Sequence, residues 1–145
     1  MVELLFSLLV SGAKLVASSA VGEFAKGAGK SAFEAIKSRL ADKHRAKSLA
    51  LLEDASDNKA YEAAVKADLA QPSIAEDSEL LQLAEKLREA IEALPAETQA
   101  RYAVDIEIIR SGRNLLFEAV EGVKAKSATS EGDMTFRNVK APPGK

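Results

Sequence analysis

The sequence has no cysteine, no tryptophan and a single histidine, His44, in 145 residues. The absence of cysteine excludes disulfide bonds, thiolate zinc sites and thiol nucleophiles. One histidine also excludes a metal site built from several histidines of the same chain. Only 5% of the residues are aromatic. We therefore expect neither a bound metal nor a cofactor.

A clear secretion signal or membrane anchor is also missing. Residues 1–22 are the most apolar segment, but Glu3 stands where a signal peptide carries a basic residue, and Lys14 interrupts the run. Nine strongly apolar side chains favour insertion by about 3–5 kcal/mol, and a mid-span lysine costs about 3 kcal/mol, so the net is near zero. Two interpretations are open: a helix that stays in the middle of a bundle, and a helix that is buried at rest and can move into a bilayer. They are compatible as two states of one protein. The apolar side chains of this segment are Leu4, Leu5, Phe6, Leu8, Leu9, Val10, Leu15, Val16 and Val21.

The abundant residues favour helix. Ala, Leu, Glu and Lys dominate, and 47% of the chain is hydrophobic. The clearest helical pattern begins after a capping Asp77 or Ser78 and ends at Pro95. Its apolar stripe, spaced by three and four residues, is Leu80, Leu83, Leu87, Ile91 and Leu94. The predicted fold is all-α: a bundle of about four to five helices with an apolar N-terminal helix, plus a C-terminal tail that is disordered or β-forming.

Other helices are expected on both sides of this stripe. A glycine-containing break at residues 27–29 separates two helices near the N-terminus, Asp57 caps a helix that ends before Pro72, and another helix begins near Ala96. The sequence does not decide between helix and strand for residues 103–110. Apolar and charged side chains alternate with period 2 over residues 104–108, which favours a strand, whereas the residues just before them favour a helix. We expect the helical region to end at residues 111–112, which divides the chain into a domain of residues 1–110 and a tail of residues 111–145.

Charge is distributed unevenly along the chain. Residues 1–50 carry a net charge of +4 (8 basic, 4 acidic), and residues 51–110 carry −8 (6 basic, 14 acidic). An amphipathic helix next to the apolar one would present a cationic face, either to anionic lipid or simply to solvent. The candidate lipid contacts are Lys26, Lys30, Lys37, Arg39 and Lys43. Nucleic acid is not an expected partner, because no aromatic residues are interleaved with these charges, and His44 receives no role.

The acidic middle of the chain favours a scaffold over a catalyst. Its carboxylates are scattered over exposed helix positions, and none is paired with a base, a metal motif or an oriented nucleophile. We therefore expect no enzymatic activity and no small-molecule substrate.

The tail contains a short pattern that is either written twice or similar by chance. Residues 114–121 align with residues 133–140 at an offset of 19, so that Phe117 matches Phe136 while Glu118 faces Arg137. If the two copies stacked in register as strands, like apolar side chains would lie over each other and each glutamate would lie over a cation. The predicted stacking core is Asn114, Leu115, Phe117, Glu118, Val120 and Glu121 against Asp133, Met134, Phe136, Arg137, Val139 and Lys140.

This order of segments resembles the HeLo-like cell-death effectors, specifically the bacterial Bell domains that carry a C-terminal amyloid signalling motif. Fungal HeLo domains and the four-helix killer domain of necroptosis are distant analogues. The resemblance implies a helical bundle that stays inactive until its tail is templated into an amyloid. Oligomerisation would then release the N-terminal helix, and its apolar residues between Leu4 and Val21 would permeabilise the membrane.

The resemblance also implies partners and a location. They are further copies of the chain, an NLR-type immune sensor with a matching amyloid motif, and membrane lipids after activation. The protein would be cytoplasmic at rest and at the inner membrane once activated, in a bacterial antiphage defence that kills the infected cell. The alternative is a non-lytic helical adaptor that oligomerises through its tail and recruits a partner protein.

Overall fold

The computed structural model describes the backbone of residues 1–131 and the side chains of residues 1–123. Within this part all regular secondary structure is helical, which confirms the predicted fold class, although the elements are shorter and more numerous than the four to five expected. In chain order they are α1 (Val2–Val16), α2 (Val21–Lys26), α3 (Gly29–Asp42), the 3-10 helix η1 (Ser48–Asp54), α4 (Lys59–Leu69), α5 (Pro72–Ala75), α6 (Ser78–Glu92), α7 (Ala96–Tyr102) and α8 (Ile106–Glu131).

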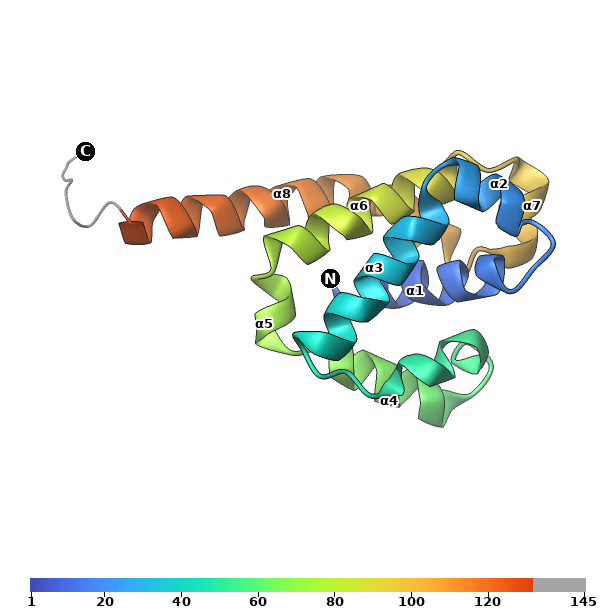
Figure 1. Cartoon of the computed structure of the whole chain (residues 1–145), viewed down its shortest axis with the longest axis horizontal. Helices are drawn as coiled ribbons and strands as arrows, with labels where there is room; N and C mark the ends of the chain where they lie inside the picture. Colours follow the sequence, from blue (N-terminus) through green and yellow to red (C-terminus); the bar gives the residue numbers. More distant parts are fainter. Residues whose placement is uncertain (132–145) are drawn as a thin grey trace.

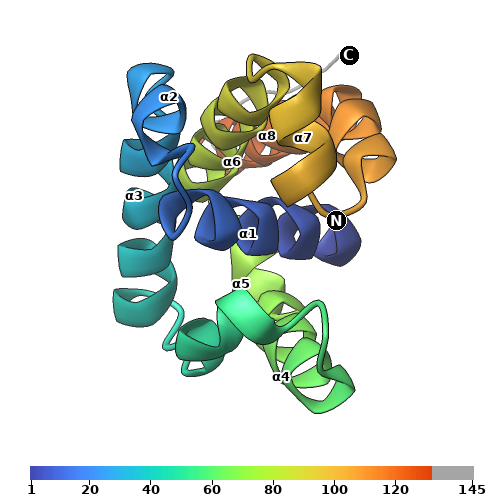
Figure 2. The same ribbon diagram turned by 90° about the vertical axis from the view of Figure 1, so that its right-hand side faces the viewer.

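The apolar helix α1 lies in the middle of the molecule. Figure 2 shows α4 and α5 on one side of it, α6, α7 and α8 on the other, and α2 and α3 along a third side. Helix α1 makes substantial contacts with each of these helices except α5, and also with η1. A helix with apolar residues around most of its circumference needs partners on all sides, and this bundle provides them.

Helices α3, α6 and α8 form the layer on which α1 rests (Figure 1). The predicted stripe of α6 is buried, apart from the half-buried Leu83. Asp77 caps this helix as predicted, since its side chain accepts a hydrogen bond from the Leu80 amide at 3.2 Å. Helix α4 begins one residue later than expected, because Asn58 caps it in place of Asp57, accepting from the amides of Ala60 and Tyr61.

The break between α2 and α3 lies where the glycines predicted it, but for a different reason. The residue in the left-handed conformation there is Ala28 (φ 64°), and no described glycine has a positive φ. Gly29 is instead required by close packing, since a Cβ at this position would lie 2.2 Å from the Phe24 ring and 2.9 Å from the Ala90 Cβ. This glycine therefore lets the start of α3 approach α6.

Within residues 103–110, residues 106–110 are helical, and residues 103–105 form the turn that precedes them. Ala103 is extended, Asp105 has a φ of 53°, and α8 begins at Ile106. The predicted end of the helical region at residues 111–112 is wrong, because α8 continues without interruption to Glu131. In Figure 1 the last part of α8 projects beyond the rest of the bundle.

Candidate functional site: the buried helix α1 and the groups that hold it

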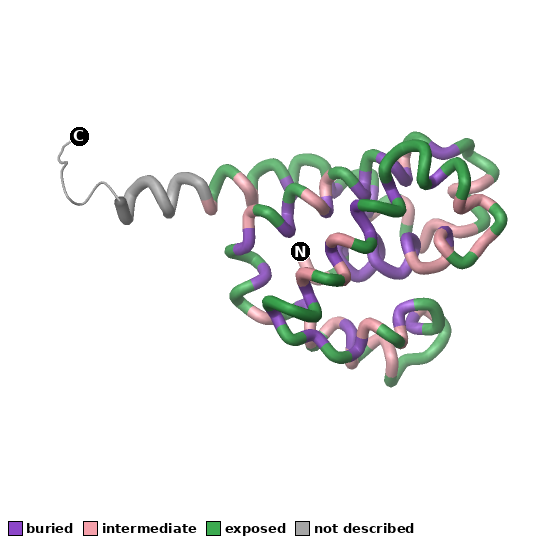
Figure 3. Tube along the Cα trace, in the orientation of Figure 1, coloured by how far each residue is buried: buried purple, intermediate pink, exposed green. Residues whose placement is uncertain are grey.

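Helix α1 carries nearly all of the residues predicted to insert into a membrane, and at rest they form the core. Figure 3 shows the α1 trace in the buried colour over most of its length. The buried members of the predicted set are Leu4, Leu5, Phe6, Leu8, Leu9, Val10 and Leu15, whereas Val16 and Val21 are half-buried. Each fully buried large apolar side chain stabilises the fold by about 1.5–3 kcal/mol. Spontaneous release of α1 is therefore strongly unfavourable.

Two glycines allow other helices to pack closely against α1. A Cβ at Gly112 of α8 would lie 2.4 Å from Cδ1 of Leu4, and a Cβ at Gly12 of α1 would lie 2.6 Å from the ring of Phe33 on α3. At distances below 3.0 Å, the neighbouring side chain would have to shift to admit the added Cβ. Gly112, expected from the sequence to stop a helix, instead permits α8 to cross α1.

A charged contact holds the N-terminal end of α1 against α4. Lys66 Nζ lies 3.0 Å from Glu3 and 2.7 Å from Glu62, and it also stands over the Phe6 ring at 5.0 Å from the ring centre. Hydrogen bonds to Glu62 and Glu3 raise the pKa of Lys66 above its usual value. Lysine at position 66 thus binds the first turn of α1 through both charge and cation–π attraction.

Two serines of α1 face the interior, and they differ in whether their hydroxyl groups are hydrogen-bonded. Ser11 Oγ accepts a 2.7 Å hydrogen bond from the Val104 amide, which satisfies the backbone just before α8. Ser7 is completely buried, and its Oγ has no hydrogen-bond partner in the described part of the chain. An unpaired buried hydroxyl weakens the hold of the bundle on α1.

We expect Ser7→Ala to stabilise the resting fold by about 1 kcal/mol, because it removes an unpaired buried hydroxyl and introduces a better helix former. Urea unfolding followed by circular dichroism measures the change. Ser11→Ala is the matched control: it leaves the Val104 amide unpaired and should cost about 1–3 kcal/mol. Equal destabilisation by both substitutions would contradict the assignment of Ser7 as unpaired.

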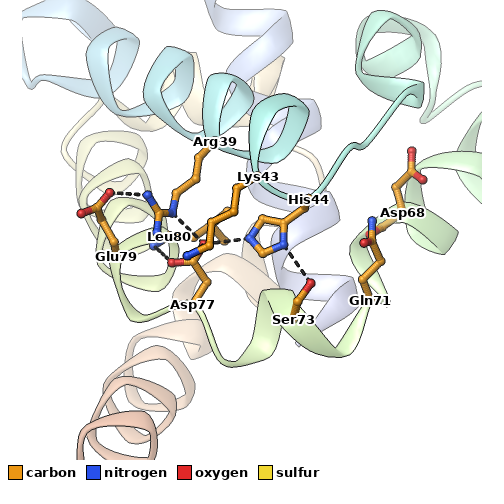
Figure 4. A network of polar contacts seen from close by, with 9 residues as sticks. All are labelled: Arg39, Lys43, His44, Asp68, Gln71, Ser73, Asp77, Glu79 and Leu80. Atoms are coloured by element: carbon orange, nitrogen blue, oxygen red, sulfur yellow. Dashed lines mark hydrogen bonds and ion pairs between the residues drawn. The ribbon is translucent and has the colours of Figure 1, made fainter. Parts of the chain in front are cut away.

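A second polar cluster joins α3, α5 and α6 around His44, the residue to which the sequence assigned no role. Figure 4 shows its imidazole between Ser73 and Asp77, with Arg39 on the other side of the Asp77 carboxylate. His44 Nε2 lies 2.7 Å from Asp77 Oδ2, and His44 Nδ1 lies 2.9 Å from Ser73 Oγ. Arg39 donates to Asp77 at 2.6 Å and to Glu79 at 2.5 Å.

The carboxylate of Asp77 is the centre of this cluster. Burial by itself raises its pKa, but hydrogen bonds from Arg39, His44 and the Leu80 amide outweigh burial and lower the pKa from 3.8 to about 2. The order hydroxyl, imidazole, carboxylate resembles the triad of serine hydrolases. Here, however, the carboxylate is also neutralised by Arg39 and caps α6. We therefore interpret the cluster as a structural contact that joins three helices.

The predicted lipid-contacting cations do not form one equivalent set. Lys26, Lys30 and Lys43 are exposed, and Lys37 is half-buried with its ammonium 5.3 Å from the centre of the Phe33 ring. Arg39 is held by Asp77 and Glu79, and this pairing raises its pKa further. Lys43 Nζ also lies 3.9 Å from Asp77 Oδ2. The contact of all five cations with lipid stays a prediction.

The first copy of the tail pattern has a different conformation from the one expected. Residues 114–121 lie within α8 and are helical in this state of the protein, neither disordered nor β-forming as expected for the tail. Leu116 is buried against the bundle, while Leu115 and Phe117 are exposed. The second copy, residues 133–140, lies outside the described residues. Stacking of the two copies stays a prediction, and it would require α8 to unwind.

The residues that sequence analysis missed make contacts between distant parts of the chain. His44 and Asp77 are 33 positions apart, Glu3 and Lys66 are 63 apart, and Ser11 and Val104 are 93 apart. No local spacing connects such pairs. The only sequence signal was that a single histidine followed an amphipathic helix, and this did not indicate its partners.

No three carboxylate or imidazole side chains in the described part of the chain converge as a metal site would require. Among residues 1–131, none of the helices combines the length and apolarity that a membrane crossing requires.

The class defined by these features is a small all-helical domain built around a buried apolar helix. The Het-E N-terminal domain family matches residues 10–142, and the chain belongs to this family. The family is related to the fungal HeLo-type cell-death domains, so the predicted resemblance is confirmed at the level of a helical domain associated with cell death. No curated protein matches the chain, and no solved structure does.

Proposed function

We propose that this protein is a membrane-targeting cell-death effector whose toxic element is helix α1, held inactive in the bundle until the C-terminal tail drives oligomerisation. The observation that carries the proposal is the burial of α1: its large apolar side chains are sequestered by contacts with nearly every other helix. The family relationship supports a role in cell death. The bacterial immune setting, the sensor partner and the amyloid trigger belong to the same proposal.

Helix α1 would act together with α2. Alone, its 15 residues span about 22 Å, which is less than the roughly 30 Å of a hydrocarbon core. Residues 2–26 as one helix would span about 37 Å. This change would require residues 17–20 to become helical, because Ala17 and Ala20 now have φ of −84° and ψ near zero, about 40° from the helical ψ. Lys26 and Lys30 would then lie near anionic headgroups.

The link between the tail and α1 is α8. Helix α8 contains the first tail copy, and through Gly112 it also packs directly on Leu4 of α1. If residues 114–121 unwound to stack as strands, the adjoining turn around Gly112 would lose its contact with α1. Templating of the tail would therefore weaken one of the main surfaces that bury the toxic helix.

The test combines dye release with a probe of α1. Because the chain has no cysteine, Leu9→Cys places a single thiol on the buried side of α1. We expect seeding with a synthetic peptide of residues 111–145 to release dye from vesicles that contain anionic lipid and to make this thiol reactive to maleimide. Ser38→Cys, at an exposed position of α3, is the control that reacts before and after seeding.

Two results would contradict the proposal in different ways. If the tail fibrils form but the vesicles stay intact and the thiol of Leu9→Cys stays protected, the protein is a non-lytic adaptor. If the peptide of residues 111–145 stays soluble at high concentration, the amyloid trigger is wrong. In fibrils, the paired change Glu118→Lys with Arg137→Glu should restore assembly that Glu118→Lys weakens, which tests the 19-residue register.

A further inference from the structure

The exposed side of α8 carries an apolar residue with no role in the bundle. Phe117 is 66% exposed, more than any other large hydrophobic side chain in the described part of the protein. It borders a groove of about 660 Å³ between α6 and α8, which is lined by Gln82, Lys86, Arg113, Leu116, Val120 and Glu121 among others. Exposed aromatic side chains beside a groove are typical of interaction surfaces.

The charges around Phe117 are arranged symmetrically along the helix. Arg113 lies four residues before Phe117 and Glu121 four residues after it, so both project from the same side of α8, about 6 Å along the axis in each direction. If a second α8 were laid antiparallel across the first, with the two Phe117 side chains meeting, each Arg113 would lie beside the Glu121 of the other copy. The surface is therefore complementary to itself.

We propose that this face of α8 is the contact of a twofold symmetric dimer of the resting, helical protein. Each Phe117 would cover the groove beside the opposite α8, and two Arg113–Glu121 ion pairs would fix the antiparallel register. A carboxylate has room for more than one cationic donor, so Glu121 is suited to this contact whatever else it binds. Self-complementarity is what a twofold interface requires, because the same patch must serve both subunits.

A second copy of the chain fits this face better than an unrelated partner. Arg113 and Glu121 lie at equal spacings on either side of Phe117. Both can form an ion pair at once only with an antiparallel helix that carries the same residues at the same spacing. The contact is small, since one stretch of helix meets another, and interfaces well below about 1,200 Å² are weak and transient. We therefore expect association that depends on concentration. The dimer does not rest on the proposed membrane activity.

Sedimentation velocity of the full chain at low salt tests the proposal. Between about 10 µM and about 1 mM, the mass should rise from 15.4 kDa toward twice that value. Phe117→Ser should keep the chain monomeric. Leu115→Ser is the matched control: Leu115 is also exposed on α8, but two residues turn the helix by about 200°, which places this side chain on the other side. The control should dimerise normally.

Charge reversal provides the decisive result. Arg113→Glu alone and Glu121→Arg alone should each weaken dimerisation by about tenfold or more, because each creates two like-charged contacts. An equimolar mixture of the two variants should dimerise again, since each copy then supplies the charge that the other needs. Circular dichroism on the same samples checks that the protein stays helical, which separates this dimer from tail fibrils.

Three outcomes would overturn the dimer. The first is a monomer at every concentration, which would leave this face for a different occupant, such as residues 132–145 of the same chain or another protein. The second is a mixture of the two charge variants that stays monomeric, which would exclude the antiparallel register. The third is equal loss of dimer in Phe117→Ser and Leu115→Ser. None of these results bears on whether α1 disrupts membranes.

Discussion

Replacing Gly112 by leucine is expected to destabilise the protein by about 3 kcal/mol and to loosen α8 from the bundle. A Cβ at this position would lie 2.4 Å from Cδ1 and 2.7 Å from Cδ2 of Leu4. Leu4 is 1% exposed and cannot move without disturbing the core. Inserting larger groups into a packed interior typically costs about 1–3 kcal/mol, and occasionally more when helix backbones must separate.

The same helix offers a matched control for this substitution. A Cβ at Gly122 would meet nothing within 4 Å. Gly122→Leu should therefore stabilise α8 by up to about 0.8 kcal/mol, since leucine is the better helix former. Urea unfolding curves of the two variants measure the difference, which we expect to be about 4 kcal/mol. Limited proteolysis then shows whether α8 is cleaved sooner in Gly112→Leu.

This comparison also tests where the folded domain ends. If Gly112→Leu were as stable as Gly122→Leu, residues 111–131 would not be packed on α1. The boundary predicted after residue 110 would then be correct, and α8 would belong to the tail. A large difference instead makes the first part of α8 an integral part of the bundle that buries α1.

Replacing Asp77 by alanine is expected to cost about 3–5 kcal/mol at neutral pH. Its carboxylate receives hydrogen bonds from Arg39, His44 and the Leu80 amide, and its side chain is only 2% exposed. Removing one member of a buried charged cluster leaves the others without compensation. The loss of the α6 cap adds about 1 kcal/mol within that range.

Glu79→Ala is the control for this prediction. Glu79 binds the same guanidinium at 2.5 Å, but its side chain is 69% exposed. Exposed ion pairs contribute at most about 1 kcal/mol, because water screens them. If Glu79→Ala and Asp77→Ala had equal effects, the stability of the cluster would depend on Arg39 alone and not on the buried junction with His44.

The same carboxylate predicts how stability changes in acid. The pKa of Asp77 in the folded state is about 2, below its usual 3.8, so the folded state binds this proton less readily than the unfolded state. Its contribution of about 2 kcal/mol is present above pH 4–5 and is lost as the pH falls toward 2. Urea unfolding at a series of pH values measures this slope. Asp77→Asn should flatten it, and an unchanged slope in that variant would contradict the assignment.

Local properties of the chain account for the parts of this architecture that could be predicted. Helix-forming composition and the spacing of Leu80, Leu87 and Ile91 are sufficient to predict an all-helical fold and the position of α6. The strongly apolar segment around Leu4–Leu15 had to be buried on most sides, whatever surrounded it. These expectations depend only on residues close together in the sequence, and the structure confirms them.

Contacts between distant segments decided the rest. Residues 106–108 and 114–121 belong to segments with a strand-like pattern, yet they are helical because Ile109, Gly112 and Leu116 present one face to α1 and α6. The pattern of β-branched residues was real, but packing overrides such weak local preferences. The helix stop expected at Gly112 was wrong for the same reason, since the glycine serves a contact with Leu4, 108 positions earlier in the chain.

The polar groups that hold α1 and α6 in place could not be predicted in the same way. His44 gains its role from Ser73 and Asp77, and Glu3 gains its role from Lys66, through pairings of side chains that only the assembled bundle brings within hydrogen-bond distance. The sequence therefore determined that the chain is helical and that its N-terminal segment is the one to be buried. The tertiary structure decided which groups bury it, because burial and charge pairing are properties of surfaces that meet only after folding.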